Sequence, residues 1–107
     1  MNRVSILILI LFTALIADAQ NASAIRVGDS LYALGDYSNA IQAYEQTERS
    51  EDKIARSYNA IGNTTKALEY YEKALLRQEA NPLTQYNYGK LLLKATQYQK
   101  ADSLFQL

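Results

Sequence analysis

The chain has no cysteine and no histidine among its 107 residues. These residues are the usual ligands of structural zinc, and they supply the thiol and imidazole groups that many enzymes use in catalysis. Their absence also excludes disulfides, so no covalent cross-link holds the fold. The Ser, Thr, Tyr, Lys and carboxylate side chains that remain form no recognisable catalytic motif. We therefore predict that the chain is not an enzyme and has no catalytic, metal-binding or cofactor-binding residues.

The chain also lacks an excess of charge of either sign, and it has few residues that break helices. Eleven basic residues balance eleven acidic ones, which gives a formal net charge of zero. Nucleic-acid binders depend on basic contacts to phosphate, so this balance argues against a nucleic-acid partner. There is one Pro and there are four Gly, against nine Tyr and many Ala. This composition favours packed helices.

The only long apolar run stands at the N-terminus. Arg3 precedes the thirteen residues of Val4–Ile16, and Ala17-Asp18-Ala19 then supplies a small-x-small cleavage pattern. We interpret residues 1–19 as a signal peptide and expect an exported mature chain that is periplasmic, envelope-associated or secreted. Thirteen residues fall short of the roughly 20 that span a bilayer as a helix, so we expect no membrane span in the mature chain. A retained membrane anchor is the alternative interpretation.

The rest of the chain repeats one pattern, Gly-x-Tyr-x-x-Ala-x-x-x-Tyr. Residues 35–44 match it in full, and residues 62–71 and 96–105 match it with substitutions, among them Thr96 in place of the first Gly. The first two copies lie 27 residues apart and the last two lie 34 residues apart. A recurrence of this size is typical of stacked helical repeats.

A small residue stands seven positions before each copy, at Gly28, Ala55 and Gly89. We expect these residues to let paired helices approach closely, and we expect the aromatic residues Tyr44, Tyr71 and Phe105 to fill the gap to the next repeat. Each repeat then reads as a helix, a tight turn and a second helix. The predicted helices are residues 22–34, 36–48, 51–61, 63–79, 82–95 and 97–107.

The predicted turns carry suitable residues. Gly35 and Gly62 suit a helix C-terminus that needs positive φ. The residues that we expect to cap the following helices with their side chains are Asp36, Ser50, Asn63 and Asn81.

Together these motifs resemble the tetratricopeptide repeat. Val27-Gly28 with Leu31, and Tyr88-Gly89 with Leu92, correspond to the first half of the repeat, and residues 35–44 correspond closely to the second half. The resemblance covers about residues 21–107. It implies an all-α, right-handed superhelical stack of antiparallel helix pairs with about three repeats. We place these repeats at residues 21–47, 48–81 and 82–107 within a domain of residues 20–107.

The resemblance also implies what the protein does. First helices of such repeats line a concave groove that binds segments of partner proteins, so we predict a protein-interaction scaffold with a protein or peptide partner. The alternative is the N-terminal sensory or docking region of a larger signalling protein, such as a membrane sensor kinase. The predicted groove residues are Ile25, Asp29, Tyr32, Asp52, Arg56, Asn59, Tyr86, Lys90 and Lys94.

The third repeat is incomplete in sequence. The chain stops inside the second helix of that repeat, with Leu104, Phe105 and Leu107 placed to pack on a further helix. Repeat arrays usually end in a polar capping element. We therefore interpret the chain as an N-terminal fragment of an exported bacterial protein, and we expect self-association through its uncapped C-terminal helix.

The signal-peptide interpretation predicts a defined N-terminus. Expression of the chain in a bacterial host should yield a product that begins at or near Gln20, because export removes residues 1–19. N-terminal sequencing of the extracytoplasmic fraction measures this directly. Recovery of uncleaved chain in the membrane pellet would instead support the retained anchor.

Overall fold

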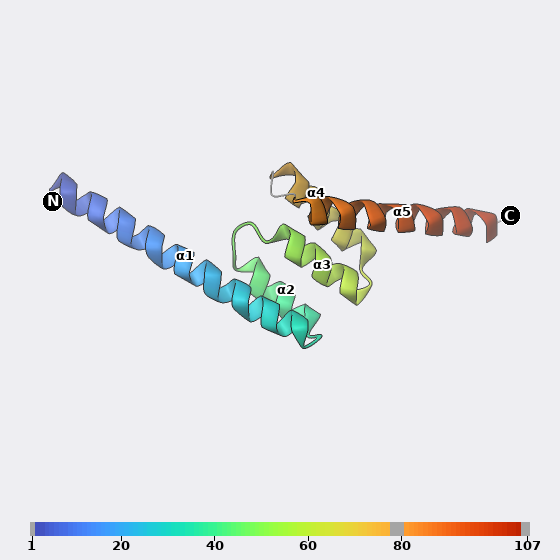
Figure 1. Ribbon diagram of the computed structural model, residues 1–107, viewed down its shortest axis with the longest axis horizontal. Coiled ribbons are helices and arrows are strands. Elements are labelled where there is room, and N and C mark those ends of the chain that lie inside the picture. The colour runs from blue at the N-terminus through green and yellow to red at the C-terminus, as the bar shows by residue number, and fades with distance from the viewer. Residues whose placement is uncertain (1, 78–80, 106–107) are drawn as a thin grey trace. The chain divides into compact units, whose positions relative to one another are not determined.

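The computed structural model describes residues 2–77 and 81–105, with side chains as far as residue 100. Every regular element within these residues is an α-helix (Figure 1). The elements are α1 (Arg3–Ala33), α2 (Tyr37–Glu45), α3 (Glu51–Ile61), α4 (Thr64–Leu76) and α5 (Pro82–Phe105). The predicted fold class, an all-α chain of antiparallel helix pairs, is confirmed.

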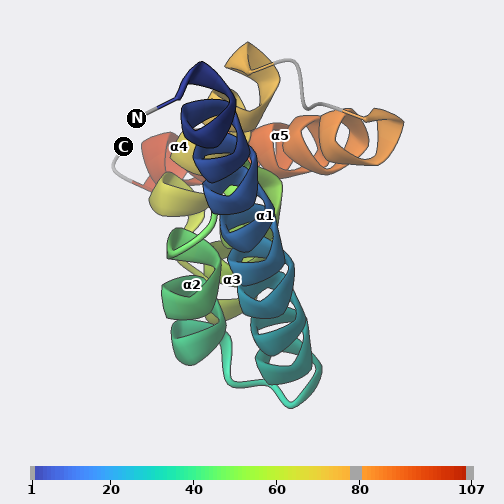
Figure 2. The same ribbon diagram turned by 90° about the vertical axis from the view of Figure 1, so that its left-hand side faces the viewer.

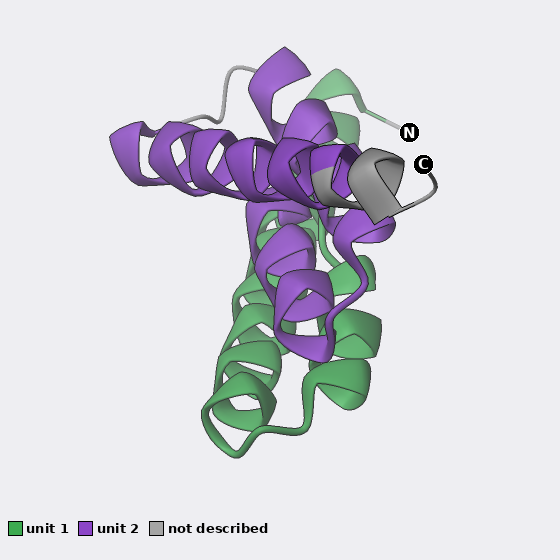
Figure 3. Ribbon diagram, turned by 90° about the vertical axis from the view of Figure 1, so that its right-hand side faces the viewer, with its two compact units in different colours: residues 1–48 green, residues 49–107 purple. Residues whose placement is uncertain are grey.

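The chain divides into two compact units (Figure 3). Unit 1 is residues 1–48 and contains α1 and α2, whereas unit 2 is residues 49–107 and contains α3, α4 and α5. Contacts between α1 and α2 hold the first unit together, and contacts of α4 with both α3 and α5 hold the second.

Each helix pair closes through the same glycine turn. Gly35 has φ of 80° and Gly62 has φ of 91°, so both lie in the left-handed region. After α1, the Gly35 N–H donates to the Tyr32 carbonyl at 3.0 Å, and the Asp36 N–H donates to the Leu31 carbonyl at 2.9 Å. The same two bonds recur after α3. This is the Schellman arrangement, and it confirms the predicted turns.

Two of the four predicted side-chain caps are present. The Asn63 Oδ1 accepts from the Lys66 N–H at 3.2 Å, and the Asn81 Oδ1 accepts from the Thr84 N–H at 2.8 Å. The predictions at Asp36 and Ser50 were wrong, because neither side chain makes a capping bond. The Asp36 carboxylate instead accepts from the Asn39 side-chain amide at 2.8 Å. Ser50 has φ of −119° and ψ of 21°, outside the extended region that caps favour.

In unit 1, the two helices approach closely where Gly28 faces Tyr44. The Tyr44 side chain is fully buried, and its hydroxyl donates to Asp29 Oδ1 at 2.5 Å. A Cβ atom at Gly28 would lie 2.6 Å from Cδ1 and 2.8 Å from Cζ of that ring. The predicted close approach at Gly28 is therefore confirmed. The sequence assigned Tyr44 to the gap before the next repeat, but its ring lies on Gly28 of its own helix pair.

In unit 2, a small core joins three helices. It consists of Ala55 of α3, Ala67 and Tyr71 of α4, and Leu91 of α5, all buried. The Tyr71 ring lies 6.3 Å from that of Tyr88, so it reaches the helix that follows its own pair, as predicted. The alanines bring α3 and α4 close enough for this single aromatic residue to contact α5 as well.

The predicted turn at Thr96 was wrong. α5 runs without interruption from Pro82 to Phe105, through the position where the sequence placed a break between two helices. Thr96 is β-branched and does not readily take the positive φ that Gly supplies in the other two turns. Its hydroxyl donates to the Leu92 carbonyl at 2.9 Å, as threonine does inside a helix.

Because α5 is one uninterrupted helix, no second helix of a third pair packs against Gly89 within the described residues. Nothing lies within 4 Å of a Cβ atom built there, so the predicted close approach at this position was also wrong. The predicted packing of Leu104, Phe105 and Leu107 falls outside the described side chains.

The sequence predicted that the first helix begins near residue 22, but α1 begins at Arg3. The large apolar side chains of Val4–Ile16 are all exposed, and α1 is long and apolar enough to cross a membrane. Secretory signal sequences meet the same criterion. The interpretation of residues 1–19 therefore stays a prediction.

The contrast between Gly28 and Gly89 predicts opposite effects of one substitution. Gly28→Ala should lower the free energy of unfolding by roughly 1–3 kcal/mol, because the new methyl group must displace the buried Tyr44 ring. Gly89→Ala should raise it by about 0.4–1 kcal/mol, because the methyl group meets open space in a helix. Denaturant titration followed by circular dichroism measures both. Effects of the same sign would show that the packing at Gly28 is not as described.

Candidate functional site

Unit 2 contains a groove between α3 and α5, with Tyr71 of α4 between them. Its main cavity is about 280 Å³ in volume. A smaller cavity of about 70 Å³ shares Arg56, Tyr71 and Asn87 with it, so the two form one continuous depression. We call this depression the basic groove. The main cavity is lined by Arg56, Asn59, Tyr71, Asn87, Lys90, Leu91 and Lys94.

The α5 side of the basic groove follows from helical geometry. Each residue of an α-helix advances by about 100°, so residues seven apart lie within about 20° of each other. Asn87 and Lys94 are seven apart, and Lys90 lies between them. Leu91 belongs to the same stripe, but it is buried in the core and fixes the rotation of the helix.

The α3 side is oriented in the same way. Ala55 is fully buried in the core of unit 2, which turns the next residue, Arg56, toward the edge of the groove. Asn59 follows three residues later on the same face. Asp52, one turn earlier, lines the smaller cavity with Lys53. α3 therefore contributes a guanidinium and an amide to the main cavity.

The main cavity favours negatively charged ligands. Three of its described lining residues are cations, two are amides and none is acidic. Lys and Arg donate to carboxylate oxygens, and amide side chains donate and accept. Tyr71 and Leu91 provide an apolar floor. The arrangement suits a short acidic segment of polypeptide, with carboxylates at the rim and apolar atoms beneath them.

A hydrogen bond between tyrosine and glutamate holds α5 on α4 beside the groove. The Tyr88 hydroxyl donates to the Glu72 carboxylate at 3.2 Å. Burial raises the pKa of Tyr88, and the hydrogen bond and negative charge of Glu72 raise this pKa further. The neutral phenol is therefore the form that the folded chain prefers. Since Tyr88 precedes Lys90 by two residues, this bond helps to position the cations of α5.

The structure brings together five of the predicted groove residues: Arg56, Asn59, Lys90 and Lys94 line the main cavity, and Asp52 lines the smaller one. Tyr86 does not line the groove, and its side chain is 65% exposed. The sequence grouped it with Lys90 and Lys94 through a spacing of four. That spacing drifts by about 40° at each step, so it carries Tyr86 off the stripe. Successive steps of three and four residues lead from Asn87 to Lys90 and Lys94, and this pattern would have selected Asn87, which the sequence analysis did not predict.

The predicted residues Asp29 and Tyr32 lie in unit 1. Asp29 accepts the hydrogen bond from the buried Tyr44, and the Tyr32 ring meets that of Tyr37 edge-on at 5.1 Å. Both side chains thus have contacts inside the α1–α2 pair. Ile25, on the same helix, is half-buried.

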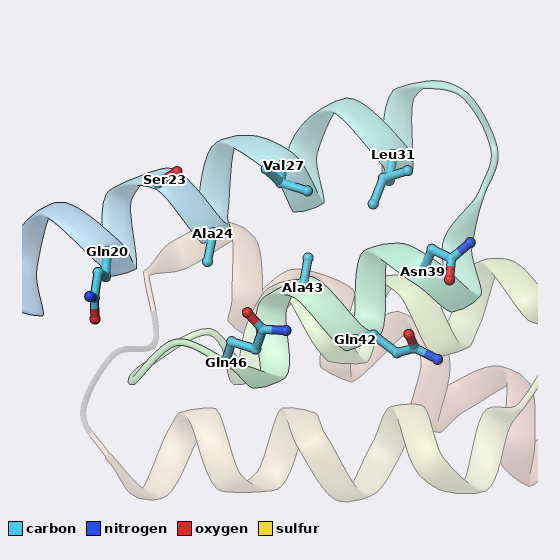
Figure 4. A pocket seen from close by; sticks show the side chains of 9 residues that line it. All are labelled: Gln20, Ser23, Ala24, Val27, Leu31, Asn39, Gln42, Ala43 and Gln46. Carbon is cyan, nitrogen blue, oxygen red and sulfur yellow. The ribbon is translucent and has the colours of Figure 1, made fainter.

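Unit 1 has a larger cavity, between α1 and α2 (Figure 4). Its volume is about 640 Å³, and we call it the neutral cavity because none of the nine described residues that line it carries a charge. α1 contributes mainly apolar side chains, whereas α2 contributes mainly amides. The nine residues are Gln20, Ser23, Ala24, Val27, Leu31, Asn39, Gln42, Ala43 and Gln46.

Comparison with known proteins identifies the repeats. Residues 23–50 and residues 52–81 each match a sequence profile described as tetratricopeptide repeat. The chain contains tetratricopeptide repeats. The first repeat corresponds to the α1–α2 pair (Figure 2), and the second corresponds to the α3–α4 pair.

The chain is also similar to tetratricopeptide repeat protein 21B of Mus musculus. The two are 33% identical over an alignment of 91 positions that covers 78% of this chain. The match spans 7% of the length of the mouse protein. No solved structure matches the chain. Tetratricopeptide repeats generally form scaffolds that bind other proteins.

The bond between Tyr88 and Glu72 predicts how the stability of unit 2 depends on pH. The pKa of Tyr88 is raised above its usual value of 10.0, so the folded state holds the phenolic proton more tightly than the unfolded state. This contribution is fully present below pH 10.0 and is lost as the pH rises through the pKa of the folded state. Glu72→Gln leaves burial, the largest cause of the raised pKa, and removes the contribution of the Glu72 charge, so it should reduce part of the drop in melting temperature at alkaline pH. Equal losses in both proteins would contradict this account.

Proposed function

We propose that this chain is an exported scaffold that binds an acidic segment of a partner protein in the basic groove. The observation that carries the proposal is the convergence of Arg56, Lys90 and Lys94 on one cavity. These residues come from two helices that are separated in the chain by a complete helix, α4. A solvated charged surface on a single helix would not account for that convergence.

The charges around the groove favour a polypeptide with carboxylates over a neutral one. Lys90 and Lys94 are exposed and Arg56 is half-buried, so their charges reach the groove entrance. Exposed charges of this kind raise association rates and select the sign of the partner, whereas apolar contacts such as those to Tyr71 supply affinity. In the smaller cavity Asp52 is accompanied by Lys53 and Arg56, so that part of the groove has no acidic excess either.

Export is part of the proposal. Arg3, the exposed apolar run and the small residues near position 19 support a cleaved signal peptide. The chain would then act in the periplasm, at the cell envelope or outside the cell. It would have no role there as an enzyme, because it lacks the residues from which catalytic sites are commonly built.

A second candidate function is the N-terminal sensory or docking region of a longer signalling protein, such as a membrane sensor kinase. The similarity to one short part of a much longer repeat protein supports an origin of the chain in a longer array. In this alternative, the basic groove recognises the signal or an accessory protein. The reading frame downstream of residue 107 separates the two, since a sensor kinase would encode a membrane span and a kinase domain.

The proposed groove is tested with charge reversals on one helix. The probe is a fluorescent peptide of alternating glutamate and alanine. Lys90→Glu and Lys94→Glu should each weaken its binding about two- to fivefold, because an exposed ion pair contributes about 0.5–1 kcal/mol. The effect should shrink as salt is added, because exposed charges are screened. Fluorescence anisotropy measures the binding.

Lys100→Glu is the matched control, because it makes the same change at an exposed position of α5 outside the groove. It should leave affinity nearly unchanged. Equal weakening by all three variants would mean that the overall charge attracts the peptide and that the basic groove is not its site. Circular dichroism confirms that each variant retains its helices.

A further inference from the structure

The neutral cavity exists because the first repeat lacks a pair of tyrosines that the second repeat has. The two repeats are offset by 27 residues, so Leu31 and Ala43 correspond to Tyr58 and Tyr70. In the second repeat these two rings stack with their centroids 5.6 Å apart between α3 and α4. In the first repeat the smaller side chains leave the equivalent space open, and both line the cavity (Figure 4).

The rim of this space also differs between the repeats. In the second repeat, Glu69 forms ion pairs with Lys66 at 3.7 Å and with Lys73 at 3.4 Å. The Lys73 ammonium lies 4.5 Å above the Tyr70 ring and covers it. The corresponding residues of the first repeat are Asn39, Gln42 and Gln46. Neutral amides thus replace the charges that close the tyrosine stack, and they can donate to and accept from a ligand.

We propose that the neutral cavity takes a tyrosine side chain from an uncharged segment of a partner protein. The apolar wall formed by Ala24, Val27 and Leu31 accepts the ring, as the same region of the second repeat accepts the Tyr58–Tyr70 stack. The amides of Gln42 and Gln46 are placed at the rim, where a phenolic hydroxyl needs a hydrogen-bonding partner. Tyrosine supplies a large contact area at a small entropic cost, and it is enriched among the residues that dominate binding energy.

The absence of charge in the described lining selects against other ligands. An ammonium group would lose hydration in this cavity without gaining an opposite charge. An adjoining hollow shares Ser23, Val27 and Leu31 with the cavity and adds Arg26, so the surroundings disfavour cations in particular. The basic groove of unit 2 has the opposite character, with three cations at its rim. The neutral cavity is therefore a separate site, and its occupation does not depend on the function proposed for that groove.

The test uses the full chain, isotope-labelled and purified as the expressing cell delivers it, with N-acetyl-L-tyrosinamide as the probe. Titration followed by NMR should shift the methyl signals of Ala24 and Ala43 in a saturable way. N-acetyl-L-leucinamide, which has no ring, and N-acetyl-L-lysinamide, which is positively charged, should bind more weakly. Signals of unit 2 serve as the reference for nonspecific effects.

The decisive variant is Ala43→Tyr, which places the residue of the second repeat in the first and fills the cavity from α2. It should weaken probe binding by about tenfold or more, because the space for the ring is lost. Ser38→Tyr adds the same side chain at an exposed position of α2 outside the cavity and should bind like the parent. Ala24→Leu fills the cavity from α1, so the test does not depend on the folding of one variant.

Probe binding that persists in a folded Ala43→Tyr or Ala24→Leu variant would overturn the proposal. Equal affinity for the leucine probe, shifts confined to unit 2, or no saturable shift at Ala24 and Ala43 would overturn it too. Loss of binding in both cavity-filling variants, with retention in Ser38→Tyr, is the supporting result.

Discussion

Reversal of the chain between paired helices depends on one backbone conformation, a residue with positive φ directly after the first helix. Gly35 and Gly62 adopt it, and each turn is closed by two hydrogen bonds from the residues after the helix to carbonyls within its last turn. At Thr96 the residue is β-branched, and α5 continues to Phe105. The presence of glycine at two positions and its absence at a third thus decides whether the chain forms a hairpin or a long helix.

Packing within each helix pair then depends on the size of the side chains at the helix contacts. Small residues let the paired helices approach, and one buried tyrosine fills the space that remains. The Tyr44 ring lies on Gly28 in unit 1, whereas Tyr71 joins Ala55 and Ala67 to α5 in unit 2. Because Leu91 belongs to this core, its position fixes which face of α5 looks into the basic groove. The basic groove is thus a consequence of the same contacts that stabilise the fold.

The two repeats share a framework but present different surfaces. The second has a stacked tyrosine pair covered by ion-paired lysines and glutamate, and its groove carries cations. The first has a cavity rimmed by amides at the corresponding positions. A scaffold of this kind distinguishes partner segments by a few residues that change between repeats, while the turn and core residues stay the same. In the two proposals, charge selects one segment and the fit of an aromatic ring selects another.

The sequence by itself determined the first two helix pairs, their turns at Gly35 and Gly62 and the close approach at Gly28, because each depends on local backbone preferences or on a recurring spacing. The same spacing misled at Thr96 and Gly89, where the turn and the close approach are absent. The sequence also predicted five residues of the basic groove, since Asp52, Arg56 and Asn59 belong to one helix and Lys90 and Lys94 to another. Only the tertiary structure showed that Asn87 lies in the groove and Tyr86 does not, because the rotation of α5 is set by Leu91 packing on α4. The neutral cavity could not be predicted from the sequence either. It depends on the distance between α1 and α2 at the position where Leu31 and Ala43 face each other, and only the tertiary structure gives that distance.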